Sequence, residues 1–492
     1  MESPPLQAAR KPRKRRVSDI REIGQQSVQY ISTRGKAPTL AFDAVTLTGL
    51  GRDGGLYVPQ TWPTFTHSEM AAMASLDYAD LALRLIHPFV GDSLDKRALA
   101  DMLRATYGAP FRHAAVAPLK QLGSNDWLLE LFHGPTLAFK DFALQLLGRL
   151  FDTFTARDGK RLTIVGATSG DTGSAAIEAT RGRDNIRIFM LHPKDRVSEV
   201  QRRQMTTIIE PNVTNIAVEG TFDDCQSMVK TLFGDLAFRD QVNLSAVNSI
   251  NWARVMAQVV YYFYAALRLG APERSVAFSV PTGNFGDVFA GYVARQMGLP
   301  IAKLVIATNQ NDILARTLAT GRYARGDVFA TLSPSMDIQV ASNFERILFD
   351  LVGRDSEQVQ AMMDALATDG GFTLPDAALG ELRSLFAAHR VDDAETSAAM
   401  AEVLASTGEL VDPHTAVGLA GAKACLADAD GPRITLSTAH PAKFGSAVIK
   451  ATGRDPQLPD HMADLLHRTE AFEVIPNEVT ILKDMILRGD HA

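Results

Sequence analysis

The sequence predicts an α/β protein whose mostly parallel sheets carry helices on both faces, preceded by a small α+β unit at the N-terminus. The chain of 492 residues is too long for one ordinary hydrophobic core. Hydrophobic residues make up 46% and charged residues 22%, which is typical of a globular enzyme. From about Val116 onward, short β-branched runs lead through loops into amphipathic helical patterns. Strands that alternate with helices indicate right-handed βαβ crossovers and hence parallel sheets.

The first 27 residues contain the run RKPRKRR and carry seven basic against three acidic side chains. Proline-rich, basic and apolar-poor sequence of this kind is typical of a disordered leader, with a localisation or nucleic-acid tag as the alternative. It has neither the apolar stretch of a secretory signal nor the pattern of an amphipathic transit helix. We therefore predict a disordered basic leader over residues 1–27 that is dispensable for the fold.

The remainder of the chain is acidic, with a net charge of −10 within an overall charge of −6. An acidic body is a poor general binder of nucleic acid, and no run of about 18 apolar residues predicts a membrane span. Cys225 and Cys425 lie in no CxxC or CxH pattern, and the histidines lack metal-ligand spacing. We expect no metal site, no disulfide framework and a cytoplasmic location. Whether the protein is a monomer or a dimer stays open.

Residues 28–110 are expected to form the α+β unit. The segments VQYISTRG and TLAFDAVTLTGLGRDGGLYVP are interpreted as short strands around a glycine-rich turn at residues 49–55. Helical patterns then run from about Ser68 to Tyr107.

Four later segments repeat the order strand, loop, helix. The region of residues 355–420 is alanine-rich and helical, and RITLSTAHPAKF supplies a late strand that runs into a polar loop. Parallel sheets bind ligands at the carboxyl ends of their strands, so the loops after these strands are the places to look for chemistry. The four segments are RLTIVGATSGDTGSAAIEAT, IRIFMLHPKDRVSEVQRRQM, SVAFSVPTGNFGDVFAGYVARQMG and AKLVIATNQNDILARTL.

One lysine, Lys140, stands in FHGPTLAFKDFALQLL, between a phenylalanine and an apolar run of helical pattern. A lysine at the edge of a core usually buries its stem and keeps its charge in water. If it is instead held inside, desolvation lowers its pKa and makes it a good nucleophile or Schiff-base former. Its immediate neighbours do not decide between the two readings.

The loop in VPTGNFGDVF follows a predicted strand and opens a helix. Glycines let backbone N–H groups approach an anion, and a helix N-terminus adds partial positive charge, so the loop suits a phosphate. It is neither a P-loop nor a dinucleotide fingerprint. The alternative is a tight turn in which Asp287 caps the helix. The loop residues are Gly283, Asn284, Phe285, Gly286 and Asp287.

The loop in GATSGDTGSAA also lies at a helix N-terminus. The hydroxyls of Thr168, Ser169 and Thr172, together with backbone amides, can hold a small carboxylate by several hydrogen bonds. Asp171 would repel that carboxylate, so we expect it to orient the loop or cap the helix. A cap rich in serine and threonine explains the loop equally well.

A third loop follows the last predicted strand and offers the hydroxyls of Ser437 and Thr438. Taken together, a lysine for a Schiff base, a glycine loop for a phosphate and hydroxyls for an amino-acid carboxylate are the parts that hold pyridoxal phosphate. A partner for the pyridine nitrogen would complete the set. A neutral hydroxyl in that place would leave the nitrogen largely unprotonated.

Seven stretches in this order resemble the threonine synthase family, in the branch with an N-terminal domain ahead of a fold type II pyridoxal-phosphate core. They are YISTRG, GRDGGLYVP, LFHGPTLAFKDF, TSGDTGSAA, NSINWARVMAQVVYY, TGNFGD and TAHPAKF, and the resemblance covers residues 28–477. It implies a catalytic core over residues 111–477, in which two α/β subdomains hold the active site between them, and a C-terminal tail over residues 478–492. It also implies that Lys140 carries the cofactor covalently, that residues 283–287 line the cofactor phosphate and that Thr438 faces the pyridine nitrogen.

The reaction that the resemblance implies is the conversion of O-phospho-L-homoserine and water to L-threonine and phosphate, with the freed amine of Lys140 as general base. The departing phosphate needs cationic or polar partners, which the sequence does not rank. Asn248 has a second reading as a helix cap, and His133 is either catalytic or fixes a tight turn. The candidates for the phosphate are Lys443, Arg202, Arg203, Asn248, Asn251 and Arg254.

Two alternatives stay open at this point. A pyridoxal-phosphate-dependent serine or threonine dehydratase is expected to share the fold, but STRG, GGLYVP and the SGDTG loop argue against it. A non-catalytic relative that only binds the cofactor is the second alternative, and the presence of Lys140 with all three loops argues against it.

Overall fold

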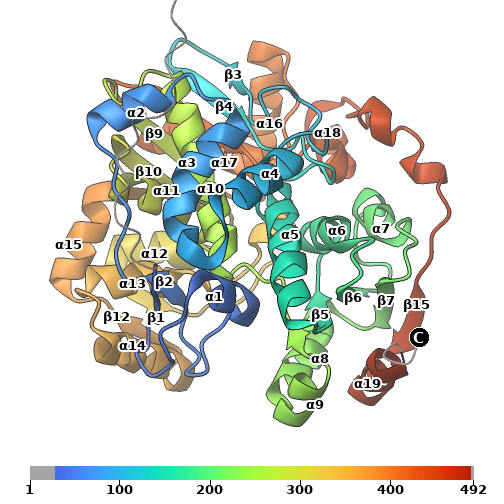
Figure 1. Ribbon diagram of the computed structural model, residues 1–492. Coiled ribbons are helices and arrows are strands. Elements are labelled where there is room, and N and C mark those ends of the chain that lie inside the picture. Colours follow the sequence, from blue (N-terminus) through green and yellow to red (C-terminus); the bar gives the residue numbers. More distant parts are fainter. Residues whose placement is uncertain (1–27, 489–492) are drawn as a thin grey trace, which may run out of the picture.

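The computed structural model describes residues 28–488, so the predicted leader over residues 1–27 and the last four residues lie outside it. Two sheets form the body of the molecule (Figure 1). All strand pairs in both sheets are parallel, except the antiparallel pair of β3 and β4 at one edge. The six-stranded sheet has the order β13-β10-β9-β14-β4-β3, with β3 Leu119–Gln121, β4 Asp126–Glu130, β9 Val276–Pro281, β10 Ile301–Thr308, β13 Phe386–Arg390 and β14 Arg433–Ser437. The five-stranded sheet has the order β15-β7-β6-β5-β8, with β5 Leu162–Ala167, β6 Ile186–Pro193, β7 Val213–Glu219, β8 Leu244–Ser245 and β15 Glu473–Pro476.

Both faces of the six-stranded sheet are covered. Alternate residues of β10 enter different apolar clusters: Leu304 and Ile306 join the main core, whereas Val305 packs with Ala422 of α17. Side chains alternate along a strand, so this division shows that each face has its own cover. The helices of this half of the molecule are α5 Lys140–Asp158, α10 Trp252–Arg268, α11 Gly286–Gln296, α12 Ile313–Thr320, α13 Phe344–Leu351, α14 Ser356–Thr368, α15 Asp376–Leu385, α16 Asp393–Thr407, α17 Pro413–Cys425 and α18 Gly445–Thr452.

The five-stranded sheet is covered in the same way. In β6, Ile188 and Met190 belong to the main core, whereas Phe189 and Leu191 pack in a second cluster that includes Leu482 of the last helix. The prediction of mostly parallel sheets with helices on both faces is therefore confirmed. The residues predicted as a C-terminal tail contain this helix. The helices of this half are α6 Asp171–Thr180, α7 Glu199–Thr206, α8 Phe222–Gly234, α9 Leu236–Gln241 and α19 Val479–Arg488.

All four predicted strand–loop–helix segments are present, as β5–α6, β6–α7, β9–α11 and β10–α12. The carboxyl ends of parallel strands lie at one edge of a sheet. The loops after β4, β9 and β14 therefore meet at one edge of the six-stranded sheet, and the loop after β5 lies at the corresponding edge of the smaller sheet. Short 3-10 helices lie in several connecting segments: η1 Gly91–Ser93, η2 Pro334–Met336, η3 Pro441–Phe444, η4 Asp460–Met462 and η5 Leu465–His467.

The N-terminal unit contains the predicted strands and has helices α2, α3 and α4 where helical patterns were predicted, but its middle part differs from the prediction. Residues that the sequence suggests as strand form helix α1 Phe42–Thr48, which buries Phe42, Val45 and Thr46 on one face and ends at Gly49. Spacings of three and four residues bury one side of a helix, and this pattern outweighs the β-branched composition. The elements of this unit are β1 Tyr30–Ser32, β2 Tyr57–Pro59, α2 His67–Met73, α3 Tyr78–Val90 and α4 Lys96–Thr106; a separate hairpin pairs β11 Arg322–Ala324 with β12 Gly371–Thr373.

Helix α10 lies at the centre of the molecule (Figure 1) and is buried on every side from Trp252 to Leu267. A helix that is apolar all round belongs in a core. It also joins the N-terminal unit to the body, because the indole of Trp252 donates a hydrogen bond of 3.1 Å to the hydroxyl of Tyr30. Within the described residues, no helix is both long and apolar enough to span a membrane.

Candidate active site

Lys140 is the first residue of α5 and is buried, with 8% of its surface exposed. Its position is set by the loop after β14: the N–H of Phe139 donates to the carbonyl of Thr438 (2.9 Å), and the N–H of His440 donates to the carbonyl of Leu137 (3.0 Å). The ammonium also lies 5.0 Å from the ring centre of Phe139. The solvent-exposed alternative for this lysine is therefore excluded.

Asp171 lies opposite Lys140 and collects four donors. Its Oδ2 accepts from Lys140 Nζ (3.2 Å) and from Ser335 Oγ (3.1 Å). Its Oδ1 accepts from Gln201 Nε2 (2.8 Å) and contacts Lys443 Nζ at 2.9 Å. Burial raises the pKa of this carboxyl, but the charges of both lysines and the Gln201 hydrogen bond lower it by more, so it lies well below its ordinary value. Asp171 is ionised at neutral pH.

Lys140 shares this carboxylate with other cations. Burial lowers the pKa of its amine, Asp171 raises it, and the charges of Lys443 and Arg254 lower it again, so that the balance lies below the ordinary value. Lys443 is fully buried and also donates to the carbonyl of Thr136 at 2.7 Å. A neutral amine is accordingly easier to form at Lys140 than at an exposed lysine.

Arg254 is the third buried cation near Lys140. Its Nη1 donates to the carbonyl of Val247 (3.1 Å), whereas its Nε has no hydrogen-bond partner among the described residues. Burial lowers its pKa to about 10. Buried donors without a partner are uncommon in native proteins. Arg254 and Lys443 also act on Lys140 as like charges. This part of the site therefore favours an anionic ligand.

The loop between β9 and α11 presents unpaired backbone donors. The N–H groups of residues 283–286 find no acceptor among residues 28–488. Phe285 adopts φ +63° at the helix cap, and its ring packs against Phe344 at 5.2 Å between ring centres. Free N–H groups at a helix N-terminus are suited to a phosphate.

Asp287 does not cap α11 as the alternative reading expected. Its Oδ1 accepts hydrogen bonds from the hydroxyls of Tyr261 (2.6 Å) and Tyr262 (2.9 Å), while its Oδ2 has no partner among the described residues. Burial raises its pKa to about 6, against the opposing effects of the two tyrosines and of Lys140. The cap residue is Phe285, which has no side-chain acceptor to offer. Asp287 instead anchors the first turn of α11 to α10.

Hydrogen bonds within the loop after β5 stabilise its conformation. Thr168 Oγ1 accepts the N–H groups of Gly170 and Gly173, both at 2.9 Å. The hydroxyls of Ser169 and Thr172 are half-buried and make no hydrogen bond to the described residues. The cap of α6 is Gly170, so Asp171 does not cap the helix. Two hydroxyls and the end of α6 are left for a carboxylate.

The two hydroxyls after β14 differ in their contacts. Ser437 Oγ lies 3.1 Å from Thr415 Oγ1, so it is occupied within the protein. Thr438 is buried and its hydroxyl has no partner among the described residues. Of the two, Thr438 is the residue with a free hydroxyl.

Several residues predicted from the sequence are not among the groups that contact Asp171. Asn248 is exposed and does not cap α10; the cap is Asn251, whose side chain accepts from the N–H of Ala253 (3.0 Å) and donates to the carbonyl of Thr46 (2.8 Å). Arg202 and Arg203 pair with Glu470 at 2.8 Å and 3.5 Å, and His133 Nε2 pairs with Glu130 at 2.8 Å.

Three residues of the site were missed by the sequence reading: Gln201, Ser335 and His414. Gln201 follows Ser198 by three residues at the start of α7, where it reads as part of a helix cap. His414 lies in VDPHTAVG, and Asp412 with Pro413 is a signal for a helix start that gives no hint of chemistry. Only the fold brings these side chains to Asp171.

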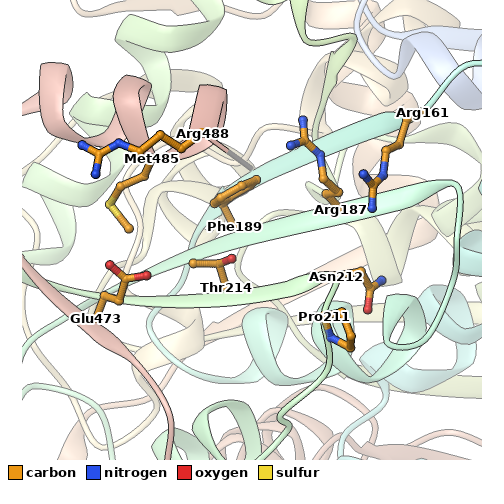
Figure 2. Close-up of a pocket in the computed structure, with 9 residues that line it drawn as sticks. All are labelled: Arg161, Arg187, Phe189, Pro211, Asn212, Thr214, Glu473, Met485 and Arg488. Atoms are coloured by element: carbon orange, nitrogen blue, oxygen red, sulfur yellow. The ribbon is translucent and has the colours of Figure 1, made fainter. Parts of the chain in front are cut away.

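A pocket of about 380 Å³ lies away from this site, on the five-stranded sheet (Figure 2). Arg161, Arg187 and Asn212 lie at the amino ends of β5, β6 and β7, whereas Asp171 follows the carboxyl end of β5. The pocket is therefore at the opposite edge of the sheet. Its lining residues are Arg161, Arg187, Phe189, Pro211, Asn212, Thr214, Glu473, Met485 and Arg488.

The donors near Lys140 fit pyridoxal phosphate. They are its buried amine and, without a partner among the described residues, the N–H groups of residues 283–286, the Thr438 hydroxyl and Arg254 Nε. Among residues 28–488, no group of three histidine, cysteine, aspartate or glutamate side chains is placed to hold a metal ion. Fold and site together define a pyridoxal-phosphate-dependent enzyme. In agreement, residues 105–385 match the family model described as pyridoxal-phosphate dependent enzyme. Pyridoxal phosphate is the cofactor.

Matches to the rest of the chain identify the family within this class of enzymes. Residues 29–107 and 415–486 match the models described as threonine synthase N terminus and threonine synthase, C-terminal. A threonine synthase of Pseudomonas aeruginosa is 57% identical and covers 92% of this chain and 96% of its own. The crystal structure of a PLP-bound threonine synthase from Brucella melitensis has a TM-score of 0.93 at 53% identity, over 95% of this chain and 100% of that one. A yeast threonine synthase structure has a TM-score of 0.90 at 39% identity, over 94% and 99%. The chain belongs to the threonine synthase family.

Proposed function

We propose that this protein converts O-phospho-L-homoserine and water to L-threonine and inorganic phosphate. The observation that carries the proposal is a cluster of three buried cations, in which Lys140 and Lys443 contact Asp171 and Arg254 acts on Lys140. An amino acid that bears a phosphate brings two anionic groups to the cofactor, and a buried cationic site binds such a ligand strongly because water screens little there.

The cofactor is held, in this proposal, by groups from three loops. The N–H groups of residues 283–286 bind its phosphate at the start of α11, Lys140 binds it covalently and the Thr438 hydroxyl meets the pyridine nitrogen. Phe285 and Asp287 support the loop from the core side through Phe344 and the two tyrosines of α10. When bound, pyridoxal phosphate withdraws electrons from the carbon atoms next to the substrate amino group.

Lys140 is the proposed proton carrier. Because its pKa is lowered, Lys140 can lose its proton, and the neutral amine can then accept another one. Asp171 holds the amine in place and stabilises its charged form. The bond from Cγ to the phosphate oxygen breaks, a water oxygen bonds to Cβ, and the proton that this water loses goes to the released phosphate. The protons that leave Cα and Cβ are balanced by protons added at Cα and Cγ. One amine beside these carbons can serve several of the transfers.

The substrate anions have separate partners in this proposal. The free hydroxyls of Ser169 and Thr172 and the end of α6 bind the carboxylate. Arg254, whose Nε has no partner within residues 28–488, is the first candidate for the substrate phosphate. Lys443 already contacts Asp171 and Thr136, so it contributes charge from the inner side of the site. Asn248 stays a candidate only if the ligand reaches the exposed start of α10.

The direct test is an assay for released phosphate and for threonine with purified protein, O-phospho-L-homoserine and pyridoxal phosphate. Lys140→Ala should reduce turnover at least a thousandfold, because general base and covalent anchor are lost together. Borohydride reduction followed by mass spectrometry should find the cofactor on Lys140 of the wild type. The matched control is Lys423→Ala, which removes an exposed lysine of α17.

Two outcomes of this assay contradict the proposal. Formation of 2-oxobutanoate from threonine, with no phosphate released from O-phospho-L-homoserine, would identify a dehydratase. Cofactor attached to a lysine other than Lys140 would overturn the residue assignment.

We also propose the domain limits and the cellular location given by the sequence. Residues 28–110 form the N-terminal domain and residues 111–477 the catalytic core, with the active site between the parts built on the two sheets. The contacts of Lys140 and Ser335 with Asp171, which follows β5 of the smaller sheet, support this division. The free thiols of Cys225 and Cys425 support a cytoplasmic location.

A further inference from the structure

A chain of hydrogen bonds leads from the N-terminus of α17 to Asp171. Asp412 Oδ2 lies 2.7 Å from His414 Nδ1 and also accepts the backbone N–H of His414 at 2.9 Å. His414 Nε2 accepts the backbone N–H of Ser335 at 3.3 Å. Ser335 Oγ in turn donates to Asp171 Oδ2 at 3.1 Å. Asp412 and His414 are buried, with 0% and 4% of their surfaces exposed.

The partners of His414 determine its tautomer. A backbone N–H can only donate, so Nε2 must carry a lone pair toward Ser335. Nδ1 therefore carries the proton and donates it to the Asp412 carboxylate. An aspartate that fixes the tautomer and orientation of a histidine in this way is a common device in catalytic sites. Here the oriented imidazole accepts the backbone N–H of Ser335. The ring of Phe444 packs against the imidazole at 4.7 Å between ring centres.

The segment that carries Ser335 is fixed from its other side as well. Asp337 Oδ1 accepts from Thr331 Oγ1 (2.6 Å) and from Asn309 Nδ2 (2.8 Å), which closes a tight loop around η2. A Cβ atom on Gly283 would lie only 3.1 Å from the carbonyl oxygen of Ser335, so this loop packs directly on the loop proposed for the cofactor phosphate. Ser335 is thus held between that loop and Asp171.

Lys140 and Ser335 use the same oxygen of Asp171, while Gln201 and Lys443 hold the other oxygen. A hydroxyl that donates to Oδ2 neutralises part of the negative charge that Lys140 meets. If the hydroxyl is removed, Gln201 and Lys443 keep the carboxylate in place. The full charge of Oδ2 then acts on Lys140 alone.

We infer that Ser335, backed by His414 and Asp412, is a positioning residue that shares the Asp171 carboxylate with Lys140 and thereby eases removal of the proton from Lys140 Nζ. The inference rests on the proposed role of Lys140 as cofactor anchor and base. The other charged groups that act on Lys140 are Lys443 of η3, Arg254 of α10 and Asp287 of α11. His414 acts on Asp171 as a charge only in its protonated form. Ser335 touches none of those three groups around Lys140, so its hydroxyl acts through Asp171.

The experiment compares holoenzymes of wild type, Ser335→Ala and Ser335→Thr. The visible absorption of the bound cofactor is titrated with pH in the absence of substrate, and kcat and KM are then measured over the same pH range. In Ser335→Ala the titration midpoint and the acid limb of kcat should both move up by about 0.5–1 pH unit, the effect of one hydrogen bond on a proton equilibrium. KM should change less than twofold, and Ser335→Thr should behave as the wild type.

The matched control is Ser279→Ala. Ser279 is fully buried and its Oγ donates to the carbonyl of Gly418 in α17 at 2.6 Å, so the variant loses a buried hydrogen bond to the same helix without touching Asp171. It should lower the melting temperature and leave the titration midpoint unchanged. If Ser335→Ala does not fold, Ser335→Cys takes its place, because a thiol of similar size is a weak donor.

An unchanged midpoint in Ser335→Ala or Ser335→Cys overturns the inference, and so does an equal shift in Ser279→Ala. These readings need no substrate. If O-phospho-L-homoserine is not turned over but the midpoint moves as expected, the proposed function fails and the role of Ser335 stands. If turnover is found and the midpoint does not move, the proposed function stands and the inference about Ser335 fails.

Discussion

The surroundings of Lys140 hold its side chain in place and also lower its pKa. Isolated, a buried ammonium is strongly destabilising, and it persists only with a paired charge and further hydrogen bonds. Asp171 supplies the charge at 3.2 Å and is itself satisfied by Ser335, Gln201 and Lys443. The lysine is therefore held in place by its ion pair, while burial keeps its proton easy to remove.

Asp287 gives a prediction about pH and stability. Burial raises its pKa to about 6 in the folded protein, above the value of about 3.9 for an unfolded chain. Between these values the folded state binds more protons than the unfolded state, so this group's contribution to stability falls as the pH rises. Asp287→Asn imitates the protonated form and keeps an oxygen for Tyr261 and Tyr262. Relative to wild type, the variant should gain about 1 kcal/mol in free energy of unfolding between pH 5 and pH 7.

Urea unfolding of both proteins at pH 5 and pH 7, with excess pyridoxal phosphate, measures this difference. Asp235→Asn is the control, because the hydrogen bond from Lys483 at 2.5 Å lowers the pKa of Asp235, so this carboxyl stays ionised between pH 5 and pH 7. A difference between Asp287→Asn and wild type that is independent of pH would show that Asp287 is already ionised at pH 5.

At the scale of elements, the start of α6 depends on one glycine. Gly170 has φ +139°, and a Cβ atom there would lie 2.5 Å from Cδ of Gln201, the residue that donates to Asp171. Gly170→Ala should therefore cost about 3 kcal/mol in free energy of unfolding, from backbone strain and the displaced glutamine. It should also lower kcat, because the displaced side chain no longer holds Asp171.

Gly182 at the other end of α6 offers the matched control. It has φ +66°, but a Cβ atom there meets nothing within 4 Å. Gly182→Ala should cost only about 1 kcal/mol, the strain of a left-handed conformation, and should leave kcat unchanged. Urea unfolding and steady-state kinetics of the two variants distinguish local strain from loss of the Gln201 contact; equal effects of both substitutions would contradict this account of Gly170.

At the scale of the whole molecule, the N-terminal unit shares its core with the body. Tyr30 is fully buried between Phe89 and Trp252, and its hydroxyl donates to the carbonyl of Phe89 at 2.6 Å. Glu345 of α13 accepts from Thr33 Oγ1 (2.5 Å) and from Nε and Nη2 of Arg34 (3.1 Å and 2.9 Å). The unit thus has its own elements, but most of its buried apolar residues within the described chain belong to the main core cluster of the body.

Glu345→Gln tests this connection. The variant keeps the size of the side chain but weakens a paired contact to Arg34, so the free energy of unfolding should fall by about 2 kcal/mol. The midpoint in urea and kcat should be measured together, and kcat should stay within twofold because Glu345 touches none of the groups around Asp171. Glu402→Gln, which weakens an exposed pair with Lys423, should cost less than about 0.5 kcal/mol. If the two variants cost the same, the N-terminal unit is not tied to the body through Glu345.

Periodicity and loop chemistry alone predicted much of this protein. The four strand–loop–helix segments, the late strand before Thr438 and the position of Lys140 at a helix start all depend on residues close in sequence, where spacing decides structure. The same information failed for Phe42–Thr48, where burial of one face against the core outweighed strand propensity, and for Asn248, because Asn251 caps α10 and the sequence offers both.

The sequence by itself determined the fold class, the family resemblance and the loops that we propose to carry the chemistry. The tertiary structure alone decided how those loops interact. Asp171 is the shared acceptor of Lys140, Lys443, Gln201 and Ser335, and His414 reaches Ser335 from a distant helix. Arg254 keeps a buried donor without a partner in the part of the chain that the structure describes. The physical reason is that the protonation state of a side chain depends on the groups that surround it in space. Residues that lie 31, 30 and 164 positions from Asp171 along the chain meet it only after both sheets have formed.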